Sequence, residues 1–171
     1  MVVLIKTIPT KYNGIKFKSK LESKWAKWLD DNKIIWDYET QGFDINGHWY
    51  LPDFYLPESN AIIEVKGAME RIEKPYELIN ELKQNGFYDP DEKLMVLLAG
   101  PVPYFYNIHP YYSDGFYINK CKCGSYTIVT KLMSYSCRSC GCHDGLRGIR
   151  QNGYTHMDVL AKPLEWLLLE E

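Results

Sequence analysis

The spacing of apolar residues along the chain changes several times, and these changes predict an α/β domain. Residues 16–32 and 73–84 carry apolar side chains at helical spacing, which predicts two amphipathic helices. Short apolar runs bounded by Gly, Pro or Asn predict strands, and residues 9–14 are expected to form a turn. The expected strands are residues 1–5, 34–38, 51–56, 61–66 and 93–99, with a hairpin over 42–50 that turns at Asn46-Gly47.

The order of these elements predicts a mixed sheet with helices packed against it, built from about the first 100 residues. A chain of 171 residues can bury one such core and still carry a small module. We expect a main domain over 1–115, a cysteine-rich module over 116–150 and a helical tail over 151–171. Thr155 and Asp158 are spaced like the capping pair of that tail helix, although Pro163 is unfavourable within it.

No segment approaches the roughly 20 apolar residues that a membrane span requires. The apolar start Met1–Ile5 is followed by Lys6 and by no small-residue cleavage site, so it predicts a strand rather than a signal peptide. We expect a cytoplasmic protein that does not contact a membrane.

Charge is distributed in blocks, although the chain as a whole carries only −2. Residues 1–35 hold eight lysines and three acids, and residues 116–150 hold six basic residues and one acid, so each block is about +5. Residues 36–115 hold fourteen acids and five bases. Basic flanks suit the binding of phosphates and an acidic centre suits a divalent cation, whereas lysine-rich solvated surfaces are the simpler explanation of either block alone.

Two short motifs in the acidic centre suggest a cation site. Pro52-Asp53 is followed eleven residues later by Glu64, which begins Glu64-Val65-Lys66 on an apolar strand. Residues two apart in a strand share a face, so Glu64 and Lys66 point the same way. If the strand after Asp53 pairs with this one, Asp53 and Glu64 can share one Mg²⁺ or Mn²⁺, with the carbonyl of Val65 as a further ligand. Either motif alone is more often an ordinary turn or a surface ion pair.

These motifs, together with Tyr12–Glu22, Tyr50–Pro57 and Ile63–Gly67, resemble phage-type PD-(D/E)XK nucleases, a class that includes Holliday-junction resolvases. The resemblance covers residues 12–67 in motif detail and extends to about residue 99 by element order. It implies a restriction-endonuclease-like fold, a bacterial or phage-infected host cell, and Mg²⁺- or Mn²⁺-dependent hydrolysis of DNA that leaves 5′-phosphate and 3′-hydroxyl ends. Lys66 would orient or help to deprotonate the attacking water.

Glu22 belongs to the same pattern, because these nucleases often carry an acid on the first helix that reaches the metal site. Its place at the border of the helix's buried face supports that role, and a surface ion pair with Lys18 one turn away is the alternative. Lysines near the predicted site are candidates for phosphate contacts. They are Lys16, Lys18, Lys20 and Lys24.

All five cysteines lie between residues 121 and 142, and in a chain without a signal peptide such clustering favours a metal over disulfides. Two Cys pairs, each followed by Gly, predict the two knuckles of a zinc ribbon, although the first pair is C-x-C rather than C-x-x-C. The preferred ligands are Cys121, Cys123, Cys137 and Cys140; Cys142 or His143 can replace one of them. The ribbon either only stabilises its segment or also binds DNA through basic residues that include Lys122, Lys131 and Arg138.

The sequence therefore predicts a divalent-metal-dependent DNA endonuclease with a structural zinc, acting on junctions or other DNA structures. The alternatives are a sequence-specific restriction or mobile-element endonuclease, a non-catalytic DNA-binding protein on a nuclease scaffold, and a zinc-ribbon module whose α/β domain binds protein. Cutting both strands would require a homodimer or two visits by a monomer.

Overall fold

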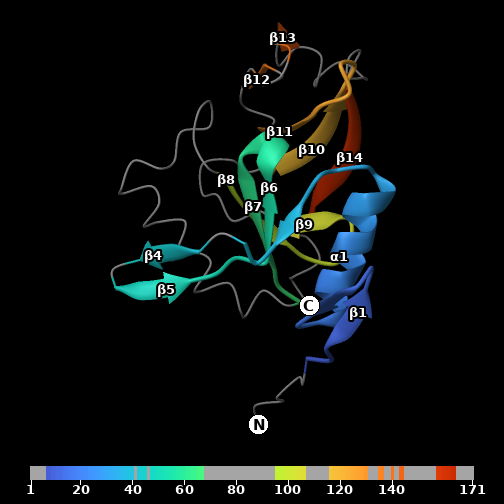
Figure 1. Ribbon diagram of the computed structural model, residues 1–171. Helices are drawn as coiled ribbons and strands as arrows, with labels where there is room; N and C mark the ends of the chain where they lie inside the picture. Colours follow the sequence, from blue (N-terminus) through green and yellow to red (C-terminus); the bar gives the residue numbers. More distant parts are fainter. Residues whose placement is uncertain are drawn as a thin grey trace, which may run out of the picture.

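The computed structural model describes residues 7–40, 42–45, 47–67, 95–106, 116–130, 135–136, 140, 143–144 and 157–164. The strand expected over 1–5, the helix over 73–84 and most of the linker over 100–115 lie outside these residues. The described part is a mixed α/β structure whose centre is one eight-stranded sheet (Figure 1). No helix in this part of the chain is long and apolar enough to cross a lipid bilayer.

The sheet is mixed, with strand order β11-β10-β14-β9-β8-β7-β6-β3. Neighbouring strands are antiparallel except for the parallel pairs β7 with β8 and β14 with β9. The strands are β3 (Asp37–Tyr38), β6 (Phe54–Leu56), β7 (Ala61–Val65), β8 (Met95–Ala99), β9 (Tyr104–Tyr106), β10 (Phe116–Cys121), β11 (Tyr126–Thr130) and β14 (Met157–Leu164). Three two-stranded pairs lie outside the sheet: β1 (Thr10–Tyr12) with β2 (Ile15–Phe17), β4 (Phe43–Ile45) with β5 (His48–Tyr50), and β12 (Tyr135–Ser136) with β13 (His143–Asp144).

The segment before the helix is a hairpin, so the prediction of a plain turn over 9–14 and of a helix beginning near residue 16 was wrong there. Asn13 and Gly14 both have positive φ, which is the backbone of a tight two-residue hairpin turn. Helix α1 (Lys20–Asp31) starts only after this hairpin. The Ser19 hydroxyl accepts a hydrogen bond from the N–H of Glu22 at 3.1 Å and so caps the helix.

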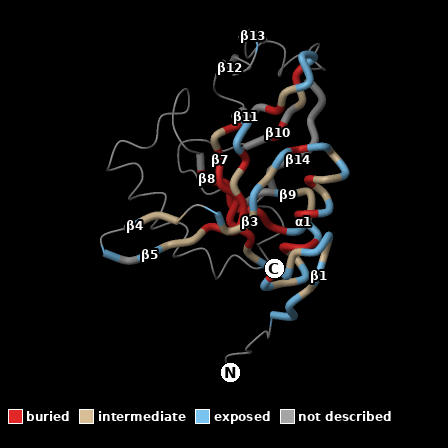
Figure 2. Tube along the Cα trace, in the orientation of Figure 1, coloured by how far each residue is buried: buried red, intermediate tan, exposed pale blue. Residues whose placement is uncertain are grey.

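The core lies between α1 and one face of the sheet. Trp25, Ala26 and Leu29 of the helix are fully buried, and they pack in one cluster with the inward-facing residues of β6, β7 and β8. The buried indole of Trp25 donates a hydrogen bond to the Gly100 carbonyl at 2.8 Å, which ties the helix to the end of β8. Figure 2 shows this buried zone running along β6 and β7. Each such side chain contributes about 1.5–3 kcal/mol through its burial.

The expected helical tail is instead strand β14, and this prediction was wrong. Residues 157–164 lie inside the sheet, antiparallel to β10 and parallel to β9. Tertiary pairing overrides the leucine spacing that suggested a helix. Pairing with β10 reaches Ala161, so Pro163, which cannot donate a backbone hydrogen bond, lies where the described pairing is with β9 alone.

The cysteine-bearing hairpin β10–β11 continues the main sheet, and the boundary predicted at residue 115 does not divide the hydrophobic core. Ile118 and Tyr126 belong to the same buried cluster as Phe17 and Trp25. The Tyr126 hydroxyl donates to the carbonyl of Asn32 at the end of α1. The hydroxyl of Ser59 in the short 3-10 helix η1 (Pro57–Ser59) donates to the Tyr126 carbonyl at 3.3 Å.

Candidate active site and metal centre

Strands β6 and β7 bring the two predicted carboxylates together. Phe54 pairs with Ile63, so Asp53, one residue earlier, faces Glu64, one residue later, across the antiparallel ladder. Both side chains are buried, with 8% of Asp53 and 5% of Glu64 exposed. The Val65 N–H donates to Asp53 Oδ2 at 2.8 Å, which fixes that carboxylate beside the strand. The pairing that the sequence analysis required is therefore present.

Glu64 and Lys66 lie on the same face of β7, away from helix α1. The Lys66 ammonium forms an ion pair with Glu64 Oε1. Glu64 Oε2 and the hydroxyl of Tyr50 at the end of β5 are both buried, and the Tyr50 hydroxyl lies within hydrogen-bonding reach of Glu64. Two buried carboxylates and a buried hydroxyl therefore meet at one place.

Burial and neighbouring charges raise the pKa of two groups in this cluster. Burial, and then the negative charge of Glu64, raise the pKa of Asp53 to about 8, against the lowering effect of its hydrogen bond from Val65. Glu22 raises the pKa of Asp53 further, and Lys66 lowers it. The pKa of Tyr50 is raised by burial first and by Glu64 next, so its hydroxyl stays protonated beside the acids.

Glu22 is held at the edge of this cluster by two donors. Its Oε2 accepts the backbone N–H of Lys18 at 3.1 Å and the hydroxyl of Tyr38 at 2.6 Å. Tyr38 is itself fixed by packing against Phe17 and Phe54, with ring centroids 4.6 and 5.5 Å away. The alternative of a simple Lys18–Glu22 ion pair across one turn is wrong, because the Lys18 ammonium pairs with Glu39 instead.

The residues present fit a divalent cation with some movement of their side chains. Asp53 and Glu64 offer the hard oxygen donors that a divalent cation prefers, and Glu64 Oε2 is buried. Glu22, Asp53 and Glu64 do not form a tight triad, because the one described group of three ligands within 4.8 Å of one another is made of cysteines. The role of the Val65 carbonyl stays a prediction.

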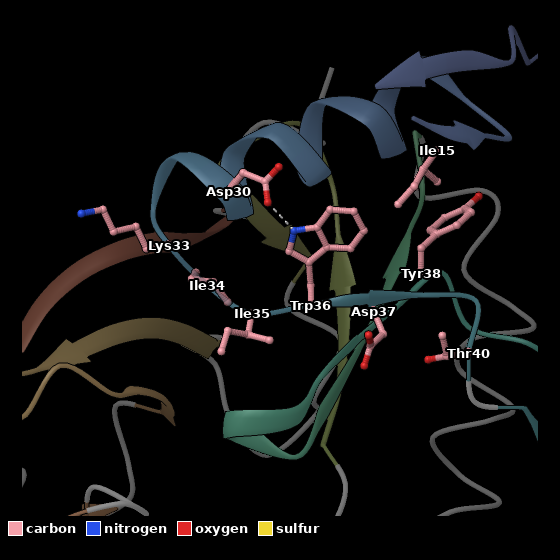
Figure 3. A pocket seen from close by; sticks show the side chains of 9 residues that line it. All are labelled: Ile15, Asp30, Lys33, Ile34, Ile35, Trp36, Asp37, Tyr38 and Thr40. Carbon is pink, nitrogen blue, oxygen red and sulfur yellow. Dashed lines mark hydrogen bonds between the residues drawn. The ribbon is translucent and has the colours of Figure 1, made fainter. Parts of the chain in front are cut away.

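A separate hollow of about 660 Å³ lies between the end of α1, β2 and β3 (Figure 3). Asp30, one of the two acids on its wall, accepts hydrogen bonds from the indole of Trp36 at 2.8 Å and from the hydroxyl of Tyr12 at 2.9 Å. Its polar group is therefore satisfied within the protein. The hollow borders the candidate site only through Tyr38, whose hydroxyl donates to Glu22.

The predicted phosphate-binding lysines of the first basic block lie on the surface near α1. Lys16, Lys20 and Lys24 are exposed and form no ion pair with another described residue, whereas Lys18 pairs with Glu39. Lys16 and Lys18 alternate with buried Phe17 on β2, so both face outward. In the second block Lys122 is exposed, and Lys131 and Arg138 lie outside the described residues.

Three of the predicted zinc ligands form a cluster at the turn of the β10–β11 hairpin. The sulfur atoms of Cys121, Cys123 and Cys140 lie within 4.8 Å of one another, and those of Cys121 and Cys140 are 3.7 Å apart. Two thiolates bound to one tetrahedral zinc with bonds of about 2.3 Å are separated by about 3.8 Å, so the spacing suits zinc. The side chains of Cys137, Cys142 and His143, which compete for the fourth position, lie outside the described side chains.

The C-x-C departure from the usual knuckle is accommodated by Gly124. Its φ of +95° belongs to the region that favours glycine, and its N–H donates to the Cys121 carbonyl at 2.8 Å. The N–H of Cys121 in turn donates to the Ser125 carbonyl at 2.8 Å. This tight turn brings the first two thiols to the same side of the hairpin.

Sequence reasoning missed Tyr50 and Tyr38 as parts of the site. For Tyr50 the signal was present, because the predicted hairpin ends one residue before Leu51-Pro52-Asp53 and so had to approach the acids. For Tyr38 no local signal existed, since its contact with Glu22 joins residues sixteen positions apart through the aromatic cluster.

Comparison of the chain with models of protein families, with curated proteins and with solved structures finds no match. The site is therefore interpreted from its own geometry.

Proposed function

We propose that this chain is a divalent-metal-dependent DNA endonuclease with a restriction-endonuclease-like, PD-(D/E)XK core. The observation that carries the proposal is the buried pair of acids, Asp53 and Glu64, facing each other across β6 and β7 with the Lys66 ammonium beside them. Burying two carboxylates side by side is unfavourable unless a bound cation or a reaction makes use of them. Such perturbed acids gather at functional sites.

Asp53 and Glu64 would hold Mg²⁺ or Mn²⁺, with the Val65 carbonyl as a further ligand. The cation would supply charge neutralisation at the phosphate and a more acidic water. In the hydrolysis, the oxygen of a water forms a bond to phosphorus and the bond from phosphorus to the 3′ oxygen breaks. The water's proton passes to a base and the leaving oxygen takes up another, which gives 5′-phosphate and 3′-hydroxyl ends.

The residues of the chain divide this work according to where they lie. Lys66, on the same face as Glu64, orients the attacking water and stabilises the charge that develops on the phosphate. Glu22 contributes a third negative charge from α1, and Tyr38 positions it. The exposed Lys16, Lys20 and Lys24 bind the DNA backbone, which contributes affinity without sequence preference.

The cysteine cluster would complete a zinc site with Cys137, or with Cys142 or His143 as the fourth ligand. Its first two ligands lie on a hairpin that is docked on α1 through Tyr126, so zinc would stabilise the edge of the main sheet. Lys122, Lys131 and Arg138 would add phosphate contacts from this side.

The test is incubation of the purified chain with supercoiled, linear and four-way-junction DNA, with Mg²⁺, with Mn²⁺ and with neither. We expect cleavage only with a divalent cation, and a loss of at least about 100-fold in Asp53→Asn and in Glu64→Gln. Glu58→Gln is the matched control, because it removes an exposed acid near the same strands and should leave cleavage unchanged. Cleavage that survives in either site variant would overturn the assignment, and a wild-type chain that binds but never cuts these substrates would favour the non-catalytic alternative.

A further inference from the structure

The outer face of the β4–β5 hairpin carries the most exposed large apolar side chain among the described residues. Trp49 is 73% exposed, although an indole can bury more apolar area than most side chains. The hairpin projects from the side of the molecule, away from α1 and the central strands (Figure 1). Nothing in the proposed catalytic chemistry uses this side chain.

The indole is held in one place on the hairpin. A Cβ atom built on Gly42 would lie 2.0 Å from Cζ2 and 2.5 Å from Cε2 of Trp49, so the ring rests directly on the Gly42 backbone. Only a residue without a side chain allows this contact. The ring is therefore ordered while most of it faces solvent, and an ordered side chain loses less conformational entropy when it binds.

The same strand connects this ring to the candidate active site. Successive side chains of a strand point to opposite faces, so Trp49 and Tyr50 lie on opposite faces of β5 while their Cα atoms are about 3.8 Å apart. The hydroxyl of Tyr50 is buried beside Glu64. A polymer held at the acids therefore passes close to the base of the hairpin.

The surroundings of Trp49 favour the binding of a single planar group, such as a nucleobase, over the binding of a protein surface. Its cross-strand neighbour is Asp44, an exposed acid whose carboxylate accepts the N–H of Gly47 at 2.8 Å, so the side chains of the hairpin that the structure describes form no continuous apolar patch around the ring. A specific protein interface usually buries about 800 Å² on each partner, which a single ring on a narrow hairpin does not supply. A nucleobase needs only the face of the ring.

We propose that Trp49 stacks on an unpaired or unstacked nucleobase of the bound DNA, so that the β4–β5 hairpin selects DNA with accessible bases. This inference rests on the proposed function, because it takes the chain that lies across the acids to be DNA. It adds a preference for junctions, single strands or distorted duplexes over regular duplex DNA.

The test measures binding in the full chain carrying Glu64→Gln, so that cleavage does not interfere. The probes are a single-stranded oligonucleotide and a four-way junction containing 2-aminopurine, and a regular duplex of the same sequence. We expect Trp49→Ala to weaken binding to the first two by roughly 5- to 150-fold, the range for one base–aromatic stack, and to affect the duplex less. The quenching of 2-aminopurine on binding should also be reduced.

Two further variants make the result specific. Trp49→Phe keeps a ring and should restore most of the affinity, and Ile35→Ala removes another exposed apolar side chain, 57% exposed, and should change nothing. Unchanged affinity and quenching in Trp49→Ala would overturn the proposal. A Trp49→Ala variant that changes the sedimentation of the protein but not its affinity for DNA would also overturn the proposal. Trp49 would then belong to a contact between two copies of the chain.

The outcomes separate this proposal from the one it rests on. If the wild-type chain cleaves DNA and Trp49→Ala binds DNA with normal affinity, only the stacking proposal is refuted. If the wild-type chain cleaves DNA with neither cation and Trp49→Ala binds DNA more weakly, the nuclease proposal is refuted and the stacking proposal stands.

Discussion

Replacing Asp53 by Asn should stabilise the metal-free protein, and the gain should grow with pH. Burial and the charge of Glu64 raise the pKa of Asp53 from an ordinary 3.8 to about 8 in the folded chain. Between these two values the folded protein holds a proton that the unfolded chain has released, so the wild type loses stability as pH rises. Asn carries no charge, and its side-chain oxygen can still accept the hydrogen bond from Val65.

The size of the gain in stability follows from the difference between the pKa of Asp53 in the folded chain and its ordinary value. Each pKa unit corresponds to about 1.4 kcal/mol, so the gain in the free energy of unfolding can increase by at most about 1.4 kcal/mol per pH unit between pH 4 and pH 8. The full difference sets a ceiling of about 6 kcal/mol, and movement of the two acids apart lowers it. For a chain of this length, even 2 kcal/mol raises the melting temperature by roughly 4–8 °C.

The assay is thermal unfolding at pH 5, 7 and 9 in magnesium-free buffer without a chelator, so that metal bound to the cysteines stays in place. Glu58→Gln removes the same charge from an exposed position and should show no comparable trend. Adding Mg²⁺ should stabilise the wild type more than Asp53→Asn. A stability difference that is the same at all three pH values, or a variant that is less stable at pH 9, would refute the reasoning.

Three other predictions concern Tyr50, the cysteine cluster and the second basic block. Tyr50→Phe removes the buried hydroxyl beside Glu64 and should lower the single-turnover cleavage rate by roughly tenfold, whereas an unchanged rate would remove Tyr50 from the site. The purified chain should contain one zinc, and elemental analysis of Cys123→Ser should find much less, whereas an unchanged content would remove Cys123 from the site. Reversing Lys122, Lys131 and Arg138 to Glu should weaken DNA binding and make its salt dependence shallower by about one unit per lost phosphate contact, and an unchanged slope would confine DNA binding to the first basic block.

The pairing of Asp53 with Glu64 was predictable because it depends on local rules. The alternation in 61–66 and the short loop between the two strands together restrict the register, and the structure has the required pairing. Burial of Glu22 was predicted from its position beside the apolar stripe of α1. The positions of acidic side chains on two adjacent strands and one helix can therefore be predicted from the sequence.

The errors arose where contacts distant in sequence decide the structure. The leucines of the tail suit a helix, yet residues 157–164 pair with β9 and β10, which lie far away along the chain. The start of α1 was placed too early, although Ser19 and Glu22 have the spacing of a helix cap and the N–H of Glu22 does bond to Ser19. Avoiding the first error would have required knowledge of the tertiary pairing. The second could have been avoided from the sequence, because the signal for the helix cap was present.

The insertion of β14 between β9 and β10 has a consequence for how the protein is made. Fifty residues, 107–156, separate the end of β9 from the start of β14, so at synthesis rates of 5–20 residues per second the ribosome needs roughly 3–10 s to make them. Throughout that time β9 can pair only with β8, because its other neighbour, β14, has not been made. Strand β10 likewise lacks β14, which joins it to β9 in the finished sheet. The strand that joins the acidic half to the cysteine hairpin is the last of the described strands to be made. The nascent chain therefore cannot complete this sheet before residues 157–164 have been made.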